Sequence, residues 1–321
     1  MMKKAIQIPL KVESLEAALL RLSKNYVKRP RVEQELGKAK AGYFGEKSID
    51  YYLKDFSSNH FHILHDLRLR IANDNFFQID ILINTPNCLL IIEVKNYVGS
   101  LYFDGNFKQL IREKNGVEEG MENPIPQVIN QQRKLKKWLN INNLPSLPII
   151  PLVVIANPTT IIKASSDYKE ALEMVYLADN LPAKILSIQQ TFNTRRKIIH
   201  DLDSFSDHLI NCHEPKKVDI LEQLKVPESA ILTGVHCPNC SALPMERKKG
   251  SWYCPKCLFE SKEAHIPSLK HYYLLLGKTI TNQKLRNFLH LPSPYTASRI
   301  LKSMNLKYTG STKFRQYELH F

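Results

Sequence analysis

The chain has 321 residues, of which 43% are hydrophobic and 24% are charged, so its length and composition suit about two domains with ordinary cores. Its 45 Lys and Arg residues exceed its 31 Asp and Glu residues, which gives a formal net charge of +14. This charge favours a polyanionic partner, and nucleic acid fits it better than a membrane surface. The sequence has no uncharged apolar stretch of the ~18 residues that a membrane helix needs, and its first residues lack the apolar region of a signal peptide.

Apolar periodicity predicts an α/β domain that is followed by two small modules. A helical N-terminal segment is expected first, broken at Arg29-Pro30, and a second helix is expected from residue 41 to about residue 55. The other predicted elements are strands over 60–71, 76–83, 88–95 and 148–156, a short hairpin through Gly99 and Gly105, and an amphipathic helix over 124–140. The predicted boundaries are 1–37 for the helical segment, 38–213 for the α/β domain, 230–262 for a cysteine-rich module and 265–321 for a basic module.

Two adjoining strands place charged side chains amid apolar residues, and this is the most informative signal in the sequence. Asp80 lies within the first of these strands, and Glu93 and Lys95 end the second. Side chains alternate along a strand, so Glu93 and Lys95 share one face, and an antiparallel turn at residues 84–87 would bring Asp80 near Glu93. A carboxylate pair holds a hard divalent cation, and a neighbouring lysine can orient or deprotonate a water molecule.

The spacing of these three residues is that of the PD-(D/E)xK nuclease core. With its flanking residues, the stretch from about 38 to 157 resembles the nuclease-related domain (NERD) family of the restriction-endonuclease-like group. The further positions that carry the resemblance are Gly42, Gly45, Glu46, Asn96, Gly99, Asn123, Pro124, Gln127 and Gln131. The resemblance implies an α/β fold with a mixed sheet flanked by helices, and a metal-dependent nuclease activity.

The resemblance also implies roles for the residues of the two strands. Asp80 and Glu93 would hold Mg²⁺ or Mn²⁺, with the backbone carbonyl oxygen of Val94 as a further ligand. Lys95 would position the attacking water and stabilise charge in the phosphorane-like transition state. The residue before Asp80 is Ile79 rather than proline, at a position that varies widely in this group.

Helical residues complete the implied catalytic set. Glu46 would complete the acidic shell from the first helix of the domain. Gln131 corresponds to a glutamine on the helix that follows the core hairpin, and Gln127 lies one turn before it on the same face. All positions of the pattern are present, which argues against an inactive enzyme.

Ordinary structural interpretations compete with these roles. An isolated Asp in a strand is commonly a surface residue, and Glu-x-Lys is commonly a surface ion pair. An acid at Glu46 is also explained by the dipole of a helix N-terminus, and Gln127 by a solvent-exposed helix position. For the whole chain, the alternative is a non-catalytic nucleic-acid-binding protein with a nuclease-like scaffold.

Four of the six cysteines form two matched C-x-x-C pairs. They are Cys237, Cys240, Cys254 and Cys257. Two such knuckles turn four thiolates toward one ion, so the spacing is typical of a zinc ribbon with a structural Zn²⁺. His236 is not needed as a ligand, and a redox C-x-x-C lacks its βαβ context here. Cysteines spaced for a metal suit a reducing cytoplasm, where we expect this protein, and Cys88 and Cys212 are expected to be inert.

The last 61 residues carry ten Lys or Arg and two acidic residues, a net charge of +8. A capped helix over 281–289, a turn, a second helix over 295–304 and a hairpin around Gly310 resemble a small winged helix. Its phosphate-binding residues are predicted to be Arg299, Lys302, Lys307, Lys313 and Arg315. The alternative is an ordinary pair of helices with a solvated charged face.

Together these signals predict a divalent-metal-dependent nuclease that hydrolyses phosphodiester bonds in DNA, with the C-terminal modules binding the substrate. RNA is the alternative substrate, and the sequence leaves open whether the chain forms a homo-oligomer. His60, His62 and His65 are expected to be surface residues.

Overall fold

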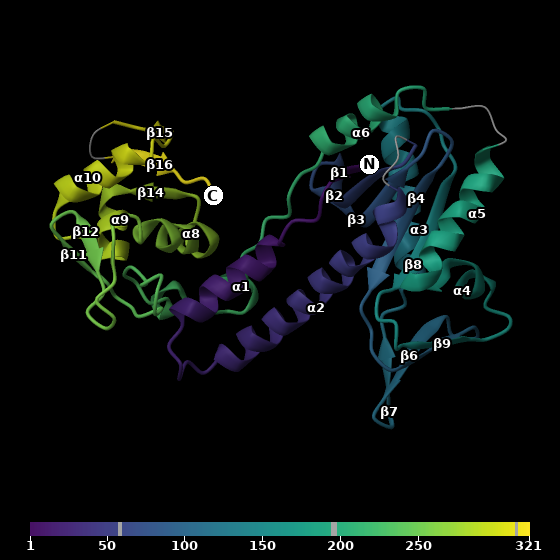
Figure 1. Cartoon of the computed structure of the whole chain (residues 1–321), viewed down its shortest axis with the longest axis horizontal. Coiled ribbons are helices and arrows are strands. Elements are labelled where there is room, and N and C mark those ends of the chain that lie inside the picture. Colours follow the sequence, from purple (N-terminus) through teal and green to yellow (C-terminus); the bar gives the residue numbers. More distant parts are fainter. Residues whose placement is uncertain (57–59, 194–197, 312–313) are drawn as a thin grey trace. The chain divides into compact units, whose positions relative to one another are not determined.

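The computed structural model describes residues 1–56, 60–193, 198–311 and 314–321. These residues form two compact units (Figure 1). Unit 1 comprises residues 1–7 and 40–216, and unit 2 comprises residues 8–39 and 217–321. Within the described ranges, no helix has both the length and the apolar character needed to cross a membrane.

Unit 1 is built on a mixed six-stranded sheet with the order β1-β2-β3-β4-β8-β10. Its strands are β1 (Met2–Lys4), β2 (His62–Ala72), β3 (Asn75–Asn84), β4 (Leu89–Lys95), β8 (Ile149–Ile155) and β10 (Val175–Leu177). The three central strands β2, β3 and β4 pair antiparallel, whereas β1 runs parallel to β2, and β8 runs parallel to both β4 and β10. Residues 2–4 are therefore a strand, which corrects the prediction of a helical segment over 1–37.

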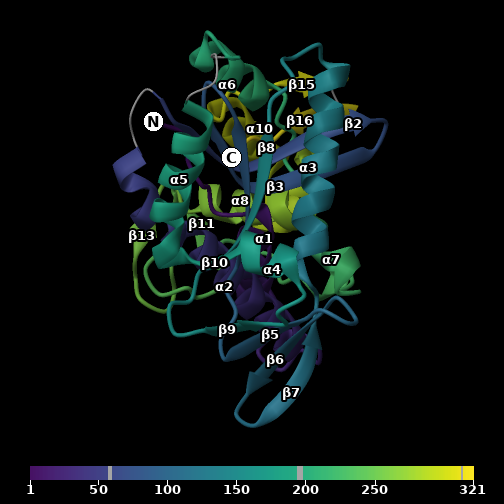
Figure 2. The same cartoon turned by 90° about the vertical axis from the view of Figure 1, so that its right-hand side faces the viewer.

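Helices cover both faces of this sheet. They are α2 (Arg29–Leu53), α3 (Pro124–Ile141), α4 (Lys169–Met174), α5 (Leu181–Asn193) and α6 (Leu202–Asn211). One core joins Leu82 of the sheet to Leu135 of α3, and a second core joins Ile81 to Ile49 of α2 and Ile185 of α5. Figure 2 shows α3 and α5 on either side of β8. The predicted mixed α/β fold with helices on both faces is confirmed.

The short hairpin that was predicted through Gly99 and Gly105 is present, as part of a larger second sheet of unit 1. The order of this sheet is β7-β6-β5-β9, and its strands are β5 (Ser100–Asp104), β6 (Gln109–Lys114), β7 (Val117–Met121) and β9 (Ile161–Ala164). The sequence pattern missed the larger sheet because β9 is distant from β5 in the chain and pairs with it in parallel.

Helix α2 is continuous from Arg29 to Leu53, which corrects the predicted new helix at residue 41. The predicted break at Arg29-Pro30 corresponds to residues 22–28, which separate α1 (Leu10–Arg21) from the start of α2. Pro30 lies in the first turn, where the missing N–H has no intrahelical partner to lose. The residues of α2 before position 40 belong to unit 2, and those from position 40 onward belong to unit 1.

Unit 2 combines α1, the start of α2 and the C-terminal third of the chain. Its elements are α1 (Leu10–Arg21), α7 (Ile220–Gln223), β11 (Glu246–Lys248), β12 (Ser251–Tyr253), β13 (Glu260–Ser261), α8 (His265–Leu275), β14 (Thr279–Thr281), α9 (Asn282–Leu289), α10 (Pro294–Ser303), β15 (Tyr308–Thr309) and β16 (Gln316–Glu318). Its strands form two sheets, β11-β12-β13 and β14-β16-β15. A single core contains Trp252 and Cys254 of the cysteine module together with Leu285 and Ile300 of the basic module. The two modules that were predicted separately therefore share one core, as expected of pieces too small to bury a core alone.

Charge is distributed unevenly between the units. Unit 2 contains 23 Lys or Arg and 11 Asp or Glu, a net charge of +12, whereas unit 1 contains 22 and 20, a net charge of +2. Most of the excess positive charge of the chain thus belongs to unit 2.

Candidate active site

The central hairpin of unit 1 brings the predicted carboxylates together. Strand β3 pairs with β4 so that Ile81 faces Ile92, and continuing this antiparallel register by one residue places Asp80 opposite Glu93. The antiparallel pairing predicted for these strands is confirmed. One of the two carboxylates is fixed by the neighbouring strand, because Oδ2 of Asp80 accepts a hydrogen bond from the Val94 amide at 2.9 Å.

Glu93 is the most enclosed acidic residue of this group, with 2% of its surface exposed. Its Oε1 accepts a hydrogen bond from Nζ of Lys95 at 2.6 Å, and its Oε2 accepts one from Nε2 of Gln131 at 2.7 Å. Lys95 also donates to Oε1 of Gln127 at 3.0 Å. The structure thus brings together four residues that the sequence had singled out, on β4 and on the helix that covers that face.

Three carboxylates in this group repel one another. Burial, followed by the charges of Glu93 and Glu46, raises the pKa of Asp80 well above its ordinary value. Burial, followed by the charges of Asp66 and Glu93, raises the pKa of Glu46 to about 7. Lys95 alone therefore does not offset the charge of the ionised carboxylates, and the raised pKa values favour binding of protons or of a further cation to this group.

Lys95 is a cation in this environment. Burial disfavours its charged form, but the charge of Glu93 and its hydrogen bond outweigh burial, so the pKa of Lys95 is raised above its ordinary value. A lysine that holds its proton this firmly can stabilise negative charge and orient a water molecule, but it is a poor general base at neutral pH.

Glu46 approaches the strands from the interior of α2 rather than from a helix N-terminus, so a helix dipole does not explain an acid at this position. The helix is fixed to the loop after β4 by Asn96, whose Nδ2 donates to the backbone oxygen of Ala41 at 2.8 Å. Asn96 belongs to the sequence pattern, and this contact gives it a physical role.

Asp66 is a fourth acidic residue of this region that was not identified from the sequence. Strand β2 pairs His65 with Ile81 and Leu67 with Ile79, which places Asp66 opposite Asp80. Asp66 has a positive φ of 48°, and its Oδ1 accepts a hydrogen bond from Nε2 of Gln78 at 2.6 Å. Folding the sequence symmetrically about the turn at residues 73–74 would place Asp66 opposite Ile81. The register shift between Arg70 and Ala72 places it opposite Asp80 instead, so the sequence pattern alone did not give this pairing.

The donor set suits a divalent cation. Gln131 is 6% exposed and its Oε1 has no hydrogen-bond partner among the described residues, while Asp80 and Glu93 are adjacent carboxyl groups that can supply oxygen ligands. Within the described ranges, the three carboxylates of Glu46, Asp80 and Glu93 do not form one of the groups of side chains whose ligand atoms already lie close enough together to hold an ion. The site therefore offers a carboxylate pair, as is common for Mg²⁺, which keeps several of its waters.

The four predicted cysteines converge in unit 2, with all four sulfur atoms within 4.8 Å of one another. Sγ of Cys237 lies 3.5 Å from that of Cys257, and Sγ of Cys240 lies 3.6 Å from that of Cys254. A tetrahedron of Zn–S bonds of about 2.3 Å has edges of about 3.8 Å, so the cluster has the size that zinc requires. Both knuckles have the same backbone form, because Ser241 and Leu258, which follow the second cysteine of each, have positive φ angles of 56° and 61°.

The predicted phosphate-binding residues lie on and after α10. Arg299 and Lys302 are exposed on that helix, and Lys307 is exposed just before β15. Arg315 is partly buried, and its guanidinium lies 4.2 Å from the ring centre of Tyr308. Lys313 lies outside the residues that the structure describes.

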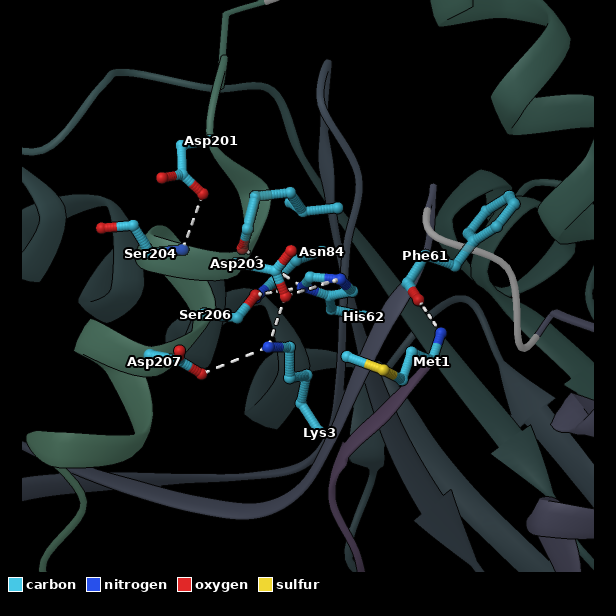
Figure 3. A network of polar contacts seen from close by, with 11 residues as sticks. Met1, Lys3, Phe61, His62, Asn84, Asp201, Asp203, Ser204, Ser206 and Asp207 are labelled. Carbon is cyan, nitrogen blue, oxygen red and sulfur yellow. Dashed lines mark hydrogen bonds and ion pairs between the residues drawn. The ribbon is translucent and has the colours of Figure 1, made fainter.

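A polar network beside β2 corrects the prediction that His62 and His65 are surface residues, because they are 1% and 0% exposed. Nδ1 of His62 lies 2.9 Å from Oγ of Ser206, and its Nε2 lies 3.7 Å from Oδ1 of Asp203 (Figure 3). This resembles a serine–histidine–aspartate arrangement, but Ser206 is 0% exposed and cannot meet a substrate. The network instead joins α6 to the sheet.

Comparisons with known proteins give a family match that lies within unit 1. No curated protein matches the chain. The crystal structure of protein VC1899 from Vibrio cholerae is similar with 12% sequence identity and a TM-score of 0.27. The match covers 58% of this chain and 52% of that protein. This chain therefore spans about half of the length of that protein. Residues 41–156 match the model of the nuclease-related domain family, which confirms the resemblance to the NERD family that the sequence pattern indicated.

Proposed function

We propose that the protein is a divalent-metal-dependent nuclease that hydrolyses phosphodiester bonds in DNA. One observation carries the proposal: Glu93 is held between Lys95 and Gln131, directly opposite Asp80, and burial and the nearby carboxylates raise the pKa of Asp80. Carboxylates alone would repel a nucleic acid, so this arrangement suits a reaction on a polyanion only together with a cation.

Asp80 and Glu93 would hold Mg²⁺ or Mn²⁺, with the Val94 carbonyl as the further ligand that the family pattern implies. The cation would supply Lewis acidity at the scissile phosphate. Lys95 would stabilise the negative charge that develops when water adds to phosphorus and the ester oxygen departs. Gln127 and Gln131 would hold Lys95 and Glu93 in position, and Glu46 would add negative charge from α2.

Unit 2 would supply the affinity for the substrate. Its net charge of +12 supports this role. The order of its last elements, a helix, a strand, two helices and two strands, resembles a winged helix, in which α10 would be the reading helix. The cysteine cluster would hold a structural Zn²⁺. Because all six cysteines are free of disulfides, we place the protein in the reducing cytoplasm.

A cleavage assay tests this function. Supercoiled plasmid and single-stranded DNA are incubated with the full chain and Mg²⁺ or Mn²⁺, and Asp80→Asn and Lys95→Ala are compared with wild type. Both variants should lose about 10²–10³-fold in rate, the scale seen when one group that stabilises the transition state is removed. Asp74→Asn, an exposed acid in the β2–β3 turn, is the matched control. A wild-type chain that binds DNA but cuts nothing with either metal would favour the non-catalytic scaffold.

A further inference from the structure

Helix α3 extends past the candidate active site and carries four cations and no acidic residue. The cations are Arg133, Lys134, Lys136 and Lys137. Unit 1 as a whole is nearly balanced, with 22 Lys or Arg against 20 Asp or Glu. Without α3, unit 1 would therefore have a net negative charge, so the helix is a local concentration of positive charge beside the site.

Lys134 lies on the side of α3 that faces the site. Gln127 marks that side, because its Oε1 accepts a hydrogen bond from Nζ of Lys95 at 3.0 Å. With about 3.6 residues per turn, Lys134 comes nearly two full turns after Gln127 and has the same orientation, whereas Lys136 lies on the opposite side of the helix. Gln127 and Lys134 are half-buried and Lys136 is exposed, which agrees with this arrangement. Lys137 comes about one turn after Lys134 and is exposed.

Neither Lys134 nor Lys137 has an anionic partner in the part of the chain that the structure describes. The ion pairs of unit 1 are made there by other cations. Lys134 and Lys137 are neighbours on the helix surface, where two like charges destabilise a helix. The fold keeps this repulsion without an internal counter-charge, and a bound anion would remove it.

We propose that Lys134 and Lys137 bind backbone phosphates of the nucleic-acid strand that is cut, to one side of the scissile phosphate. This inference rests on the nuclease proposed above and assigns part of the substrate binding to unit 1 itself. Because an α-helix rises about 1.5 Å per residue, Lys134 lies about 10 Å along α3 from Gln127. A strand of B-DNA advances about 3.4 Å per nucleotide, so Lys134 would meet a phosphate about three nucleotides from the one that Lys95 faces.

These contacts act on binding and leave the chemical step to the site. Lysine holds phosphate as a point charge, without reading a base. A contact that is equally strong in the bound substrate and in the transition state lowers KM and leaves kcat unchanged. The kinetic signature of the two lysines is therefore different from that of Lys95.

The kinetics of cleavage test the proposal. A fluorescein-labelled DNA duplex is cut by the zinc-loaded full chain with Mn²⁺, and kcat and KM are measured for wild type, Lys134→Ala, Lys137→Ala and the double variant. Each single variant should raise KM about fivefold, the scale of one charge contact in water, and keep kcat within about twofold of wild type. The slope of log (kcat/KM) against log salt should decrease by about 0.9 for each phosphate contact that is lost.

Lys136→Ala is the matched control, because it removes the same charge from the opposite side of the same helix. It should leave KM within about twofold of wild type, since salt screens a charge that does not touch the substrate. An equal rise in KM for Lys136→Ala and Lys134→Ala would show that only the overall charge of α3 matters, and the proposed contact is then wrong. It is also wrong if Lys134→Ala lowers kcat and leaves KM unchanged. All variants should fold, because the lysines reach solvent and alanine favours a helix.

Failure of this contact and failure of the nuclease are distinguishable. A chain that cuts DNA while Lys134→Ala and Lys136→Ala have the same KM overturns the contact alone. A chain that cuts nothing overturns the nuclease, and the fluorescence anisotropy of the labelled duplex then tests the contact. Weaker binding by Lys134→Ala than by Lys136→Ala leaves the contact standing, and equal binding overturns it as well.

Discussion

Gly45 of α2 lies directly against Asn96, because a Cβ atom at Gly45 would come within 2.5 Å of the Asn96 Cβ. Asn96 follows the strand that carries Glu93 and Lys95, and Glu46 is the next residue of the helix. The missing side chain at Gly45 thus sets how closely α2 approaches the site. At Gly42, the second glycine of the pattern, an added Cβ would meet no atom of another segment within 4 Å in the part of the chain that the structure describes.

Gly45→Ala should therefore damage the site, whereas Gly42→Ala should not. The methyl group at Gly45 must displace Asn96 or α2, at an expected cost of about 1–3 kcal/mol in the free energy of unfolding. We also expect a fall of about tenfold or more in DNA cleavage, because Glu46 and Lys95 move apart. Gly42→Ala should stabilise the helix by about 0.5–1 kcal/mol. Denaturant titrations and cleavage rates measure both effects, and equal behaviour of the two variants would rule out this role for Gly45.

Gln131 is expected to act through Glu93. Its amide donates to Oε2 of Glu93, so Gln131→Ala frees that carboxylate to rotate and leaves its charge less well satisfied. The affinity for the activating metal, read from cleavage against Mn²⁺ concentration, should fall about 10–100-fold, as is typical when a hydrogen bond to a metal ligand is removed. Asn130→Ala changes an exposed neighbour on α3 and should leave the Mn²⁺ dependence unchanged. An unchanged dependence in Gln131→Ala would make the glutamine a purely structural residue.

Local pattern was sufficient for the strands and for the residues that they carry. Alternation placed Asp80, Glu93 and Lys95 in neighbouring strands, and a spacing of four residues placed Gln127 and Gln131 on one helix face. Alternation and spacing along the chain could not predict the contacts between distant segments. The parallel pairing of β9 with β5 and the core shared by the cysteine and basic modules depend on which surfaces remain apolar after local folding.

Removal of zinc should loosen unit 2 and leave unit 1 folded. Cys237 and Cys254 belong to the same core as the fully buried Trp252, so four unlinked thiols weaken that core from within. The chain has two tryptophans, and a Trp138→Phe background leaves Trp252 as the only one. A zinc chelator, or Cys257→Ser, should then shift the Trp252 emission to longer wavelength and weaken DNA binding.

Cys212→Ser is the matched cysteine control, since Cys212 is outside the cluster and partly exposed. It should change neither the emission nor the affinity. Trp252 emission that ignores the chelator would show that the fold of unit 2 does not depend on a metal.

Acid should destabilise unit 1 through His62. Nδ1 of the ring lies 3.2 Å from the backbone oxygen of Leu202, which can only accept, so Nδ1 carries the proton of the neutral ring. Burial lowers the pKa of His62, and Lys3 and the terminal amine lower it further, whereas Asp203 and the Leu202 oxygen oppose them. The folded state therefore binds fewer protons than the unfolded state below pH ~6.5, so stability is fully present above that pH and is lost as the pH falls toward the folded pKa.

His62→Gln keeps a donor toward Leu202 but cannot be protonated. The denaturation midpoint of unit 1 should consequently fall less between pH 7 and pH 5 in this variant than in wild type, with circular dichroism as the measurement. His60→Gln is the control, because His60 is exposed and its loss should leave the wild-type pH dependence intact. Parallel curves for wild type and His62→Gln would assign the acid sensitivity to other groups, since proton uptake by the buried ring is the only difference that the substitution removes at these pH values.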